Sequence, residues 1–338
     1  MTEPLLEVRD LRVHFPTDDG LVKAVDGISF TLAPGETLGV VGESGSGKSV
    51  SFLTVMGLIT SRQAHIEGEI FFQGQDLLKL PAEEMRIYRG DKISMIFQDP
   101  MTSLHPYYKV GTQISEAIRT HQKVSKREAR EQAVEMLRRV GIPRPDERAD
   151  QYPHEFSGGM RQRAMIAMAL SLNPDLLIAD EPTTALDVTV QAQILDLIDR
   201  MKHEFNAAVV IITHDLGVVA EHCDHINVMY AGKVAEAGDR RDVYYEAHHP
   251  YTWGLLSSIP RLDESAVHER LNPIRGLPPS LIFVPSGCSF HPRCPYAFDR
   301  CRVEVPALLP SDGHHASACH LSLEDKERIF HEQVMVRR

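Results

Sequence analysis

The chain has 338 residues, 43% of them hydrophobic and 25% charged, which is the composition of a globular protein of about two domains with a sizeable core. Its formal charge of −11 and isoelectric point near 5.8 argue against a nucleic-acid backbone as the main partner. The first residues lack a secretory signal pattern, and no stretch reaches the roughly 18 apolar residues of a membrane span. We therefore expect a soluble, intracellular protein.

The chain begins with two segments of alternating apolar and polar residues, 5–15 and 21–32, separated by the turn residues Asp18-Asp19-Gly20. This alternation predicts an antiparallel β-hairpin. Phe15 ends the first strand, and the pattern alone leaves open whether its ring packs in the core or contacts a ligand.

A phosphate-binding pattern follows an apolar run at residues 38–41 and precedes a helix-like run. The pattern is G-x-x-x-x-G-K-S, a P-loop, and consists of Gly42, Glu43, Ser44, Gly45, Ser46, Gly47, Lys48 and Ser49. Its glycines let backbone N–H groups turn toward an anion, and the helix adds the positive end of its dipole. We expect Lys48 to reach the β- and γ-phosphates and Ser49 to bind Mg²⁺. With a strand before it and a helix after it, the pattern predicts a nucleotide site rather than a Gly/Ser-rich turn.

The next part of the chain indicates helices inserted among strands. Short strands are predicted at residues 66–72 and 91–97, and Gln98 follows the second. A capping box at residues 125–128 opens an amphipathic helix. We expect residues from about 100 to 153 to form a helical insertion.

Strands and helices alternate in the following segment. Ser157-Gly158-Gly159 opens a helix, and buried strands are predicted at residues 176–179 and 209–213. An apolar stripe at residues 190–205 predicts a helix between those two strands. This alternation predicts a parallel α/β sheet.

Polar residues follow the predicted strands at the edge where such sheets bind ligands. Asp180 can bind Mg²⁺, and Glu181 can orient and deprotonate an attacking water. Gln98 can bridge the metal and that water, and His214 can hydrogen-bond a γ-phosphate. Each residue alone would be an ordinary polar group at a strand end. Together, after a P-loop, they predict a nucleotide-hydrolysing site.

From residue 5 to residue 238, the chain resembles the ATP-binding subunit of ABC transporters. The resemblance implies a P-loop NTPase fold of ABC type, in which a parallel core sheet carries an antiparallel β subdomain and a helical insertion. It implies that ATP is contacted by the aromatic residue Phe15, by the P-loop from Gly42 to Ser49 and by Val50 directly after it. It also implies contacts from the Q-loop residue Gln98, the signature residues Ser157, Gly158 and Gly159, and the switch histidine His214. The implied catalytic residues are Glu181, His214, Gln98 and Lys48. The implied Mg²⁺ ligands are Ser49, Gln98 and Asp180.

The family signature corresponds to residues 156–160, and Ala185-Leu186-Asp187 matches the D-loop. Met160 stands where the family usually has Gln, but the Ser-Gly-Gly core and every catalytic position are intact, which implies a competent ATPase. The start of the signature helix offers free N–H groups to a phosphate. In the family it faces the nucleotide held by the opposite subunit, so that ATP lies between two chains.

Within the family, residues 99–106, 249–252 and 287–295 are similar to the oligopeptide/dipeptide importer branch. The last of these stretches lies in a Pro- and Cys-rich C-terminal extension that most ABC ATPases lack. We predict a nucleotide-binding domain at 1–240, with a helical subdomain at about 100–170, and an extension at 241–338.

Four cysteines in the extension have the spacing C-x₅-C-x₆-C-x₁₇-C. These intervals are longer than those of structural zinc sites and differ from ferredoxin spacings, so spacing alone leaves a metal centre and unliganded thiols equally open. The resemblance implies a [4Fe–4S] cluster that staples the extension, held by Cys288, Cys294, Cys301 and Cys319. Cys223 is expected to be a buried small residue. Neighbouring histidines are expected to support the cysteines or face solvent, with zinc ligation as an alternative: His291, His314, His315 and His320.

The resemblance implies an ATP-hydrolysing subunit that powers import of di- or oligopeptides, peripheral to the cytoplasmic face of a bacterial inner membrane. Its implied partners are two transmembrane permease subunits, a second ABC ATPase chain (a paralogue or a second copy), and an extracytoplasmic peptide-binding protein. ATP, Mg²⁺ and the cluster are its implied cofactors, with no nucleic acid.

Two other functions remain open. The same motor could serve nickel or another small solute, because no residue of this chain is expected to touch cargo. A soluble ABC ATPase acting on DNA or ribosomes is the alternative from another class, although such proteins carry long coiled coils, two P-loops or a basic surface, which this sequence lacks.

Overall fold

A computed structural model describes residues 3–99, 103–184, 186–258, 274–312 and 315–335. The chain divides into two compact units. The first unit comprises residues 3–5, 32–37 and 72–212, and the second comprises residues 6–31, 38–71 and 213–335. Among the described residues, no helix combines the length and apolarity that crossing a membrane requires.

The first unit contains a parallel sheet of buried strands. Strand β7 (Leu176–Asp180) lies between β6 (Ile93–Ile96) and β8 (Ala208–Thr213), with Leu176 opposite both Ile93 and Ala208. Every residue of the three strands is buried, as expected where helices cover both faces of a parallel sheet. The predicted parallel α/β core is therefore confirmed.

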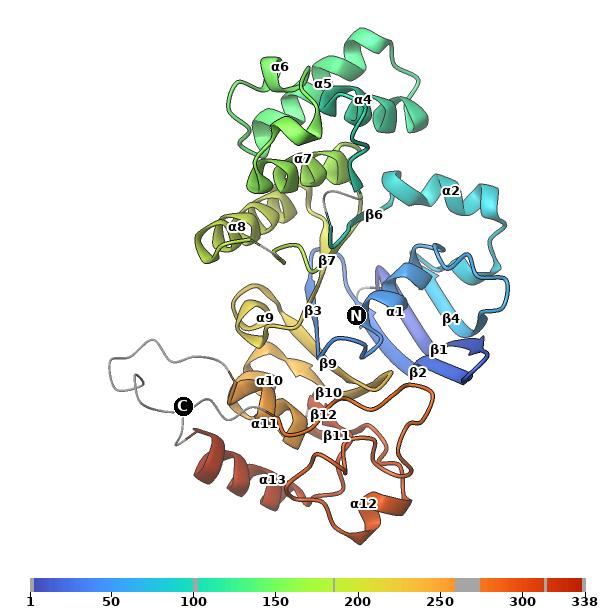
Figure 1. The fold of residues 1–338 in the computed structure, drawn as a ribbon, viewed down its shortest axis with the longest axis vertical. Helices are drawn as coiled ribbons and strands as arrows, with labels where there is room; N and C mark the ends of the chain where they lie inside the picture. The colour runs from blue at the N-terminus through green and yellow to red at the C-terminus, as the bar shows by residue number, and fades with distance from the viewer. Residues whose placement is uncertain (1–2, 100–102, 185, 259–273, 313–314, 336–338) are drawn as a thin grey trace. The chain divides into compact units, whose positions relative to one another are not determined.

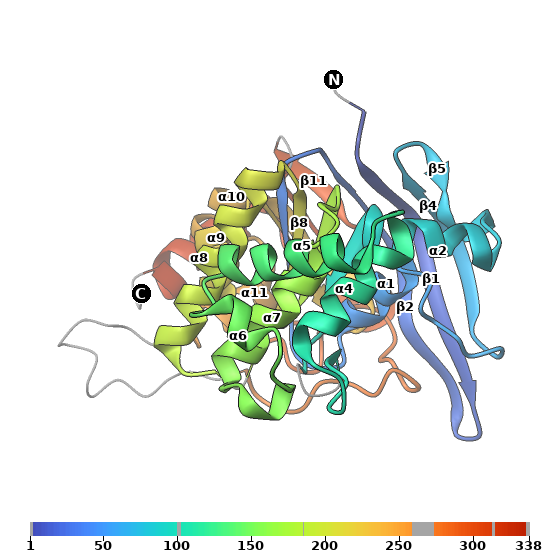
Figure 2. The same cartoon turned by 90° about the horizontal axis from the view of Figure 1, so that it is seen from above.

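Helices α4 (Val110–His121), α5 (Lys126–Arg139) and α7 (Gly158–Leu170) contact one another in the first unit (Figure 2). The predicted capping box is present, since the Glu128 N–H donates to Ser125 Oγ over 3.2 Å and the Ser125 N–H donates to Glu128 Oε2 over 2.8 Å. Further elements of this unit include β5 (Gln75–Asp76), α2 (Ala82–Asp91), α6 (Pro145–Arg148), α8 (Val188–Phe205) and 3₁₀ turns at Leu77–Lys79 and Pro153–Glu155.

The second unit contains the predicted hairpin. Strands β1 (Leu6–Thr17) and β2 (Gly20–Leu32) pair, and β4 (His65–Phe72) lies on the other side of β1 (Figure 1). Helix α1 (Lys48–Val55) packs against this sheet, with the ring of Phe52 centred 5.7 Å from that of Phe30. In β1, Leu6, Val8, Leu11 and Val13 are buried, so the predicted alternation is present on either side of a break where Arg9 and Asp10 are both exposed.

Residues of the C-terminal extension add two strands to a sheet of the second unit. Strand β3 (Thr37–Val41) pairs in parallel with β9 (His225–Tyr230), which pairs antiparallel with β10 (Lys233–Asp239). Strand β10 then pairs with β12 (His315–Ser317), and β12 pairs with β11 (Leu309–Asp312). In the part of this unit that the structure describes, the helices after α1 are short. They are α9 (Leu216–His222), α10 (Arg240–Tyr245), α11 (Pro250–Leu256), α12 (Asp299–Val303), α13 (Leu323–Ile329) and a π-helical turn at Phe330–Val334.

A buried carboxylate joins the extension to strand β10. Glu236 is fully buried and accepts hydrogen bonds from the His248 N–H, from the His249 N–H over 3.1 Å, and from His315 Nε2 over 2.8 Å. The rings of His248 and His315 stack with centroids 4.1 Å apart. Because a buried carboxylate is costly unless hydrogen-bonded, this network fixes the position of β12 beside β10.

Candidate functional site

The P-loop of the second unit has the backbone that phosphate binding requires. Gly47 has a φ of +100°, and a Cβ at this position would lie 2.2 Å from the Ala24 carbonyl oxygen, so only glycine fits. The buried Lys48 Nζ donates to the carbonyl oxygens of Gly42 and Glu43, over 2.7 and 3.0 Å. Ser46 Oγ is buried and has no hydrogen-bond partner in the described structure, an orphaned polar group that a bound phosphate could satisfy. The loop thus fits the predicted anion.

Two predicted catalytic side chains meet in the first unit. Gln98 Nε2 donates to Glu181 Oε2 over 2.9 Å, although the two residues are 83 positions apart. Thr184 Oγ1 donates to the same oxygen over 2.9 Å. Glu181 adopts a φ of +46° directly after β7, and its N–H donates to the Ile212 carbonyl, so the carboxylate is held at a sharp turn. Asp180 is buried at the end of β7.

The signature also lies in the first unit, at the start of α7. Ser157 Oγ accepts a hydrogen bond from the Met160 N–H over 3.3 Å, and the Ser157 and Gly158 residues are exposed. The buried Gln162 donates to the Pro182 carbonyl over 2.5 Å, which links this helix to the turn that carries Glu181. Within the predicted D-loop, Asp187 caps α8, whereas Ala185 lies outside the described residues.

Phe15 and His214 both belong to the second unit. Phe15 is partly buried near the end of β1. His214 is exposed just after β8, where the next residue, Asp215, caps α9 through the Gly217 N–H over 2.7 Å. Their contacts with ATP stay predictions.

The four cysteines of the extension line one pocket. The other residues that line it are His249, Pro250, Phe290, His291, Tyr296, His320 and Leu321. Backbone N–H groups of Phe290, Tyr296 and Leu321 hydrogen-bond the sulfurs of Cys288, Cys294 and Cys319, respectively. In the described ranges, no three His, Cys, Asp or Glu side chains are arranged to hold a single metal ion.

Burial controls the protonation of these thiols. It raises the pKa of Cys294 to about 12 and that of Cys319 to about 11, and it also raises the pKa of Cys288. The thiols of Cys288, Cys294 and Cys319 are therefore neutral near pH 7 without a cation, and binding a cationic centre would release protons from them. Cys223 is buried elsewhere, beside Gly39, in agreement with its predicted packing role. The predicted neighbour His314 lies outside the described residues, and His315 instead binds Glu236.

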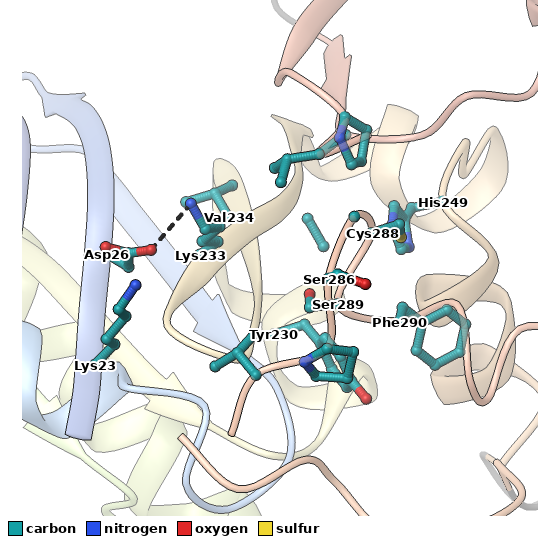
Figure 3. Close-up of a pocket in the computed structure, with 17 residues that line it drawn as sticks. Lys23, Asp26, Tyr230, Lys233, Val234, His249, Ser286, Cys288, Ser289 and Phe290 are labelled. Atoms are coloured by element: carbon teal, nitrogen blue, oxygen red, sulfur yellow. Dashed lines mark ion pairs between the residues drawn. The ribbon is translucent and has the colours of Figure 1, made fainter. Parts of the chain in front are cut away.

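A larger pocket lies between the loop at residues 284–290 and strands β2, β9 and β10 (Figure 3). Lys233 forms an ion pair with Asp26 over 3.2 Å at its edge, and Lys23 lies beside them. Tyr230 and Phe290 form part of its wall, with ring centroids 5.2 Å apart. The sequence pattern did not indicate this pocket, because its walls come from segments far apart in the chain.

Two contacts to the P-loop were also missed. Tyr251 and Arg293 both bind Glu43 and lie 208 and 250 positions from it, respectively. Both residues belong to stretches that set the importer branch apart in the sequence. The position of both residues in branch-specific stretches was the one sequence feature that could have indicated these contacts.

Comparison with known proteins agrees with this arrangement. The family described as "ABC transporter" matches residues 25–184, and "Oligopeptide/dipeptide transporter, C-terminal region" matches residues 235–301. The oligopeptide transport ATP-binding protein OppD of Salmonella typhimurium is 54% identical over 95% of each chain. The dipeptide transport ATP-binding protein DppD of Bacillus subtilis is 53% identical over 92% of this chain and 93% of its own length.

Among solved structures, the dimeric post-hydrolysis state of the ATP-binding cassette MJ0796, bound to ADP and phosphate, is similar with a TM-score of 0.63. Its sequence is 26% identical, and the match covers 70% of this chain and 99% of that one. The cbiO1 structure from Clostridium perfringens has a TM-score of 0.61 at 28% identity, over 73% of this chain and 93% of its own. The chain therefore belongs to the ATP-binding subunits of ABC transporters, within their oligopeptide/dipeptide branch.

Proposed function

We propose that the chain is the ATP-hydrolysing subunit of an ABC importer of di- or oligopeptides. The observation that carries this proposal is the 54% identity to an oligopeptide transport ATP-binding protein, which extends over 95% of both chains and so includes the extension. The intact P-loop and the Gln98–Glu181 hydrogen bond support an active ATPase.

We assign the catalytic roles residue by residue. Lys48 neutralises the β- and γ-phosphates, and the P-loop N–H groups orient them. Ser49, Gln98 and Asp180 hold Mg²⁺, which supplies charge neutralisation when bound. Glu181 orients the attacking water and accepts its proton, while Gln98 holds the Glu181 carboxylate in place.

We propose that Phe15, Val50 and His214 complete the ATP contacts of this chain. Residues Ser157 to Gly159 serve a nucleotide bound to a second ATPase chain, as their position at a helix start, with Ser157 and Gly158 exposed, supports. In this proposal, residues 1–240 form the nucleotide-binding domain, with its helical subdomain at about 100–170, and residues 241–338 form the extension.

The proposed complex also contains two transmembrane permeases and an extracytoplasmic peptide-binding protein, and places this chain at the cytoplasmic face of a bacterial inner membrane. Nickel or another small solute is the alternative cargo. The names of the relatives favour peptides, since the similar proteins are described as oligopeptide or dipeptide transport proteins.

The substitution Glu181→Gln tests the catalytic assignment. We expect ATP hydrolysis to fall at least 100-fold, because the water loses its base, whereas ATP binding persists and a closed dimer accumulates. Hydrolysis measured by phosphate release, together with size-exclusion chromatography in ATP, checks both outcomes. Hydrolysis at the wild-type rate would remove Glu181 from its role.

We further propose that Cys288, Cys294, Cys301 and Cys319 hold a [4Fe–4S] cluster that cross-links the extension. Four thiols line one pocket, and three of them face backbone N–H donors, which fits a thiolate-bound cluster. In a [4Fe–4S] cluster each of the four irons binds one thiolate, so the four cysteine sulfurs lie farther apart than they do around a single zinc ion.

Metal analysis of anaerobically purified protein tests the cluster. We expect about four iron and four sulfide per chain with broad visible absorbance, and we expect Cys301→Ser to lose most of that absorbance. The buried Cys223 provides the matched control, since Cys223→Ser should retain the iron. Stoichiometric zinc without iron would refute the cluster.

A further inference from the structure

Glu43 of the P-loop is held from outside the loop on both its backbone and its side chain. Its backbone N–H donates to the Tyr251 hydroxyl over 2.8 Å. Its two carboxylate oxygens accept from Arg293, with Nη1–Oε2 at 2.5 Å and Nη2–Oε1 at 3.0 Å. This is a bidentate pair, the strongest geometry between a guanidinium and a carboxylate.

Arg293 is itself immobilised by the extension. Its Nε donates to the Arg275 carbonyl over 3.0 Å, and its Nη2 donates to the Gly276 carbonyl over 3.2 Å. Its guanidinium lies 5.9 Å from the centre of the Tyr230 ring, and the side chain is only 6% exposed. Since Arg293 directly precedes Cys294, the cysteine-bearing loop presents a fixed cation to the P-loop.

Tyr251 is equally fixed. It is fully buried at the start of α11, and its ring packs against Tyr230 and Phe290 with centroids 4.7 and 5.4 Å away. Phe290 belongs to the same cysteine-bearing loop as Arg293. The two residues that contact Glu43 therefore both pack against the same aromatic side chains, those of Tyr230 and Phe290 for Tyr251 and that of Tyr230 for Arg293.

We propose that Arg293 and Tyr251 are positioning residues of the P-loop, through which the C-terminal extension sets the affinity for ATP. Arg293 neutralises a carboxylate that would otherwise add negative charge to a polyphosphate-binding loop. Together with Tyr251 it also holds the loop in its binding conformation before the nucleotide arrives, which lowers the entropy lost on binding. The proposal rests on the P-loop being the ATP site.

Equilibrium titration of the full chain with Mg-ATP tests the proposal in a double-mutant cycle. We expect Arg293→Gln to raise the Kd for ATP about tenfold, and Tyr251→Phe to raise it about threefold, because Tyr251→Phe removes only the hydroxyl. In a Glu43→Gln background, where no carboxylate needs neutralising, we expect Arg293→Gln to change Kd by less than about threefold.

Arg300→Gln is the matched control. Arg300 lies in the same extension and also forms a bidentate pair, with Glu304, but that pair is exposed. Its removal should leave the Kd for ATP unchanged. Iron content and the thermal midpoint without nucleotide are measured for every variant. If Arg293→Gln does not fold, Tyr251→Phe tests the other contact: because the Tyr251 hydroxyl binds the Glu43 backbone N–H, its loss of about threefold should be the same in both Glu43 backgrounds.

An unchanged Kd in Arg293→Gln, or the same loss from Arg293→Gln in both Glu43 backgrounds, would overturn the inference, as would an unchanged Kd in Tyr251→Phe. A wild-type chain that fails to bind ATP would instead refute the proposed function. The two failures are therefore distinguishable.

Discussion

At the scale of single residues, the P-loop pattern predicted both a site and the conformation of its glycines. The structure adds the reason for Gly47, which is the Ala24 carbonyl oxygen directly behind it. Gly45 also has a positive φ, of +77°, but a Cβ there would meet open space. A side chain at Gly47 would therefore clash with the backbone, whereas a side chain at Gly45 would meet only the strain of a positive φ.

This difference predicts the behaviour of two alanine variants. Gly45→Ala should lower the free energy of unfolding by about 1 kcal/mol, because alanine is strained in a left-handed backbone conformation. Gly47→Ala should cost at least about 2 kcal/mol and weaken ATP binding more than tenfold, because the added carbon clashes with fixed backbone. Urea unfolding and ATP titration measure both effects. Equal losses in the two variants would contradict the steric account.

At the scale of helices and strands, elements with a strong local sequence pattern were predicted, and elements with a weak pattern were not. Strands β6, β7 and β8 and the capping box of α5 follow directly from their sequence patterns. Helix α4 lies within the predicted helical insertion, but its bounds were not predicted, even though Val110, Ile114 and Ile118 recur every four residues and are fully buried. Helix α2 carries little apolar periodicity and has non-helical backbone at Arg89 and Gly90, so no pattern indicates it.

Strands β11 and β12 could not be predicted from local sequence. They span four and three residues, and proline occupies position 310 of β11. Their order depends on pairing with β10 and on the Glu236 network, whose partner His315 lies 79 positions away. Such non-local contacts leave no periodic signal.

The same network predicts an acid sensitivity of the second unit. Burial, with the neighbouring His315, lowers the pKa of His248 from 6.5 to about 4, so the folded state keeps this ring neutral. Between pH 6.5 and 4 the unfolded chain binds a proton that the folded chain does not, and stability falls as the pH falls. His248 alone should account for about 3 kcal/mol of this loss, and His249, whose pKa burial also lowers to about 4, should add to it.

Chemical denaturation at pH 7, 5.5 and 4.5 measures this effect. His248→Gln should reduce the pH dependence by about half, because burial lowers the pKa of His249 to about 4 as well. His203→Gln, on the exposed surface of α8, should leave the pH dependence as in the wild type. Identical pH profiles for all three proteins would contradict the assignment to His248.

At the scale of the whole molecule, the sequence predicted the ABC class and its importer branch, and the comparisons confirmed both. It also predicted Gln98 and Glu181 as neighbours, because the carboxyl ends of parallel strands meet at one sheet edge. It did not predict the Glu43–Arg293 pair, since 250 positions separate these residues and either charge could have faced solvent. The branch-specific motifs were visible, but their role required the fold.

Peptide uptake by intact cells tests the central claim most directly. Cells that carry Glu181→Gln in place of the wild-type chain should lose uptake of a labelled tripeptide, whereas uptake of labelled nickel ions should stay at the wild-type level. Full tripeptide uptake by the variant, or a loss confined to nickel, would contradict the proposal that this ATPase powers peptide import.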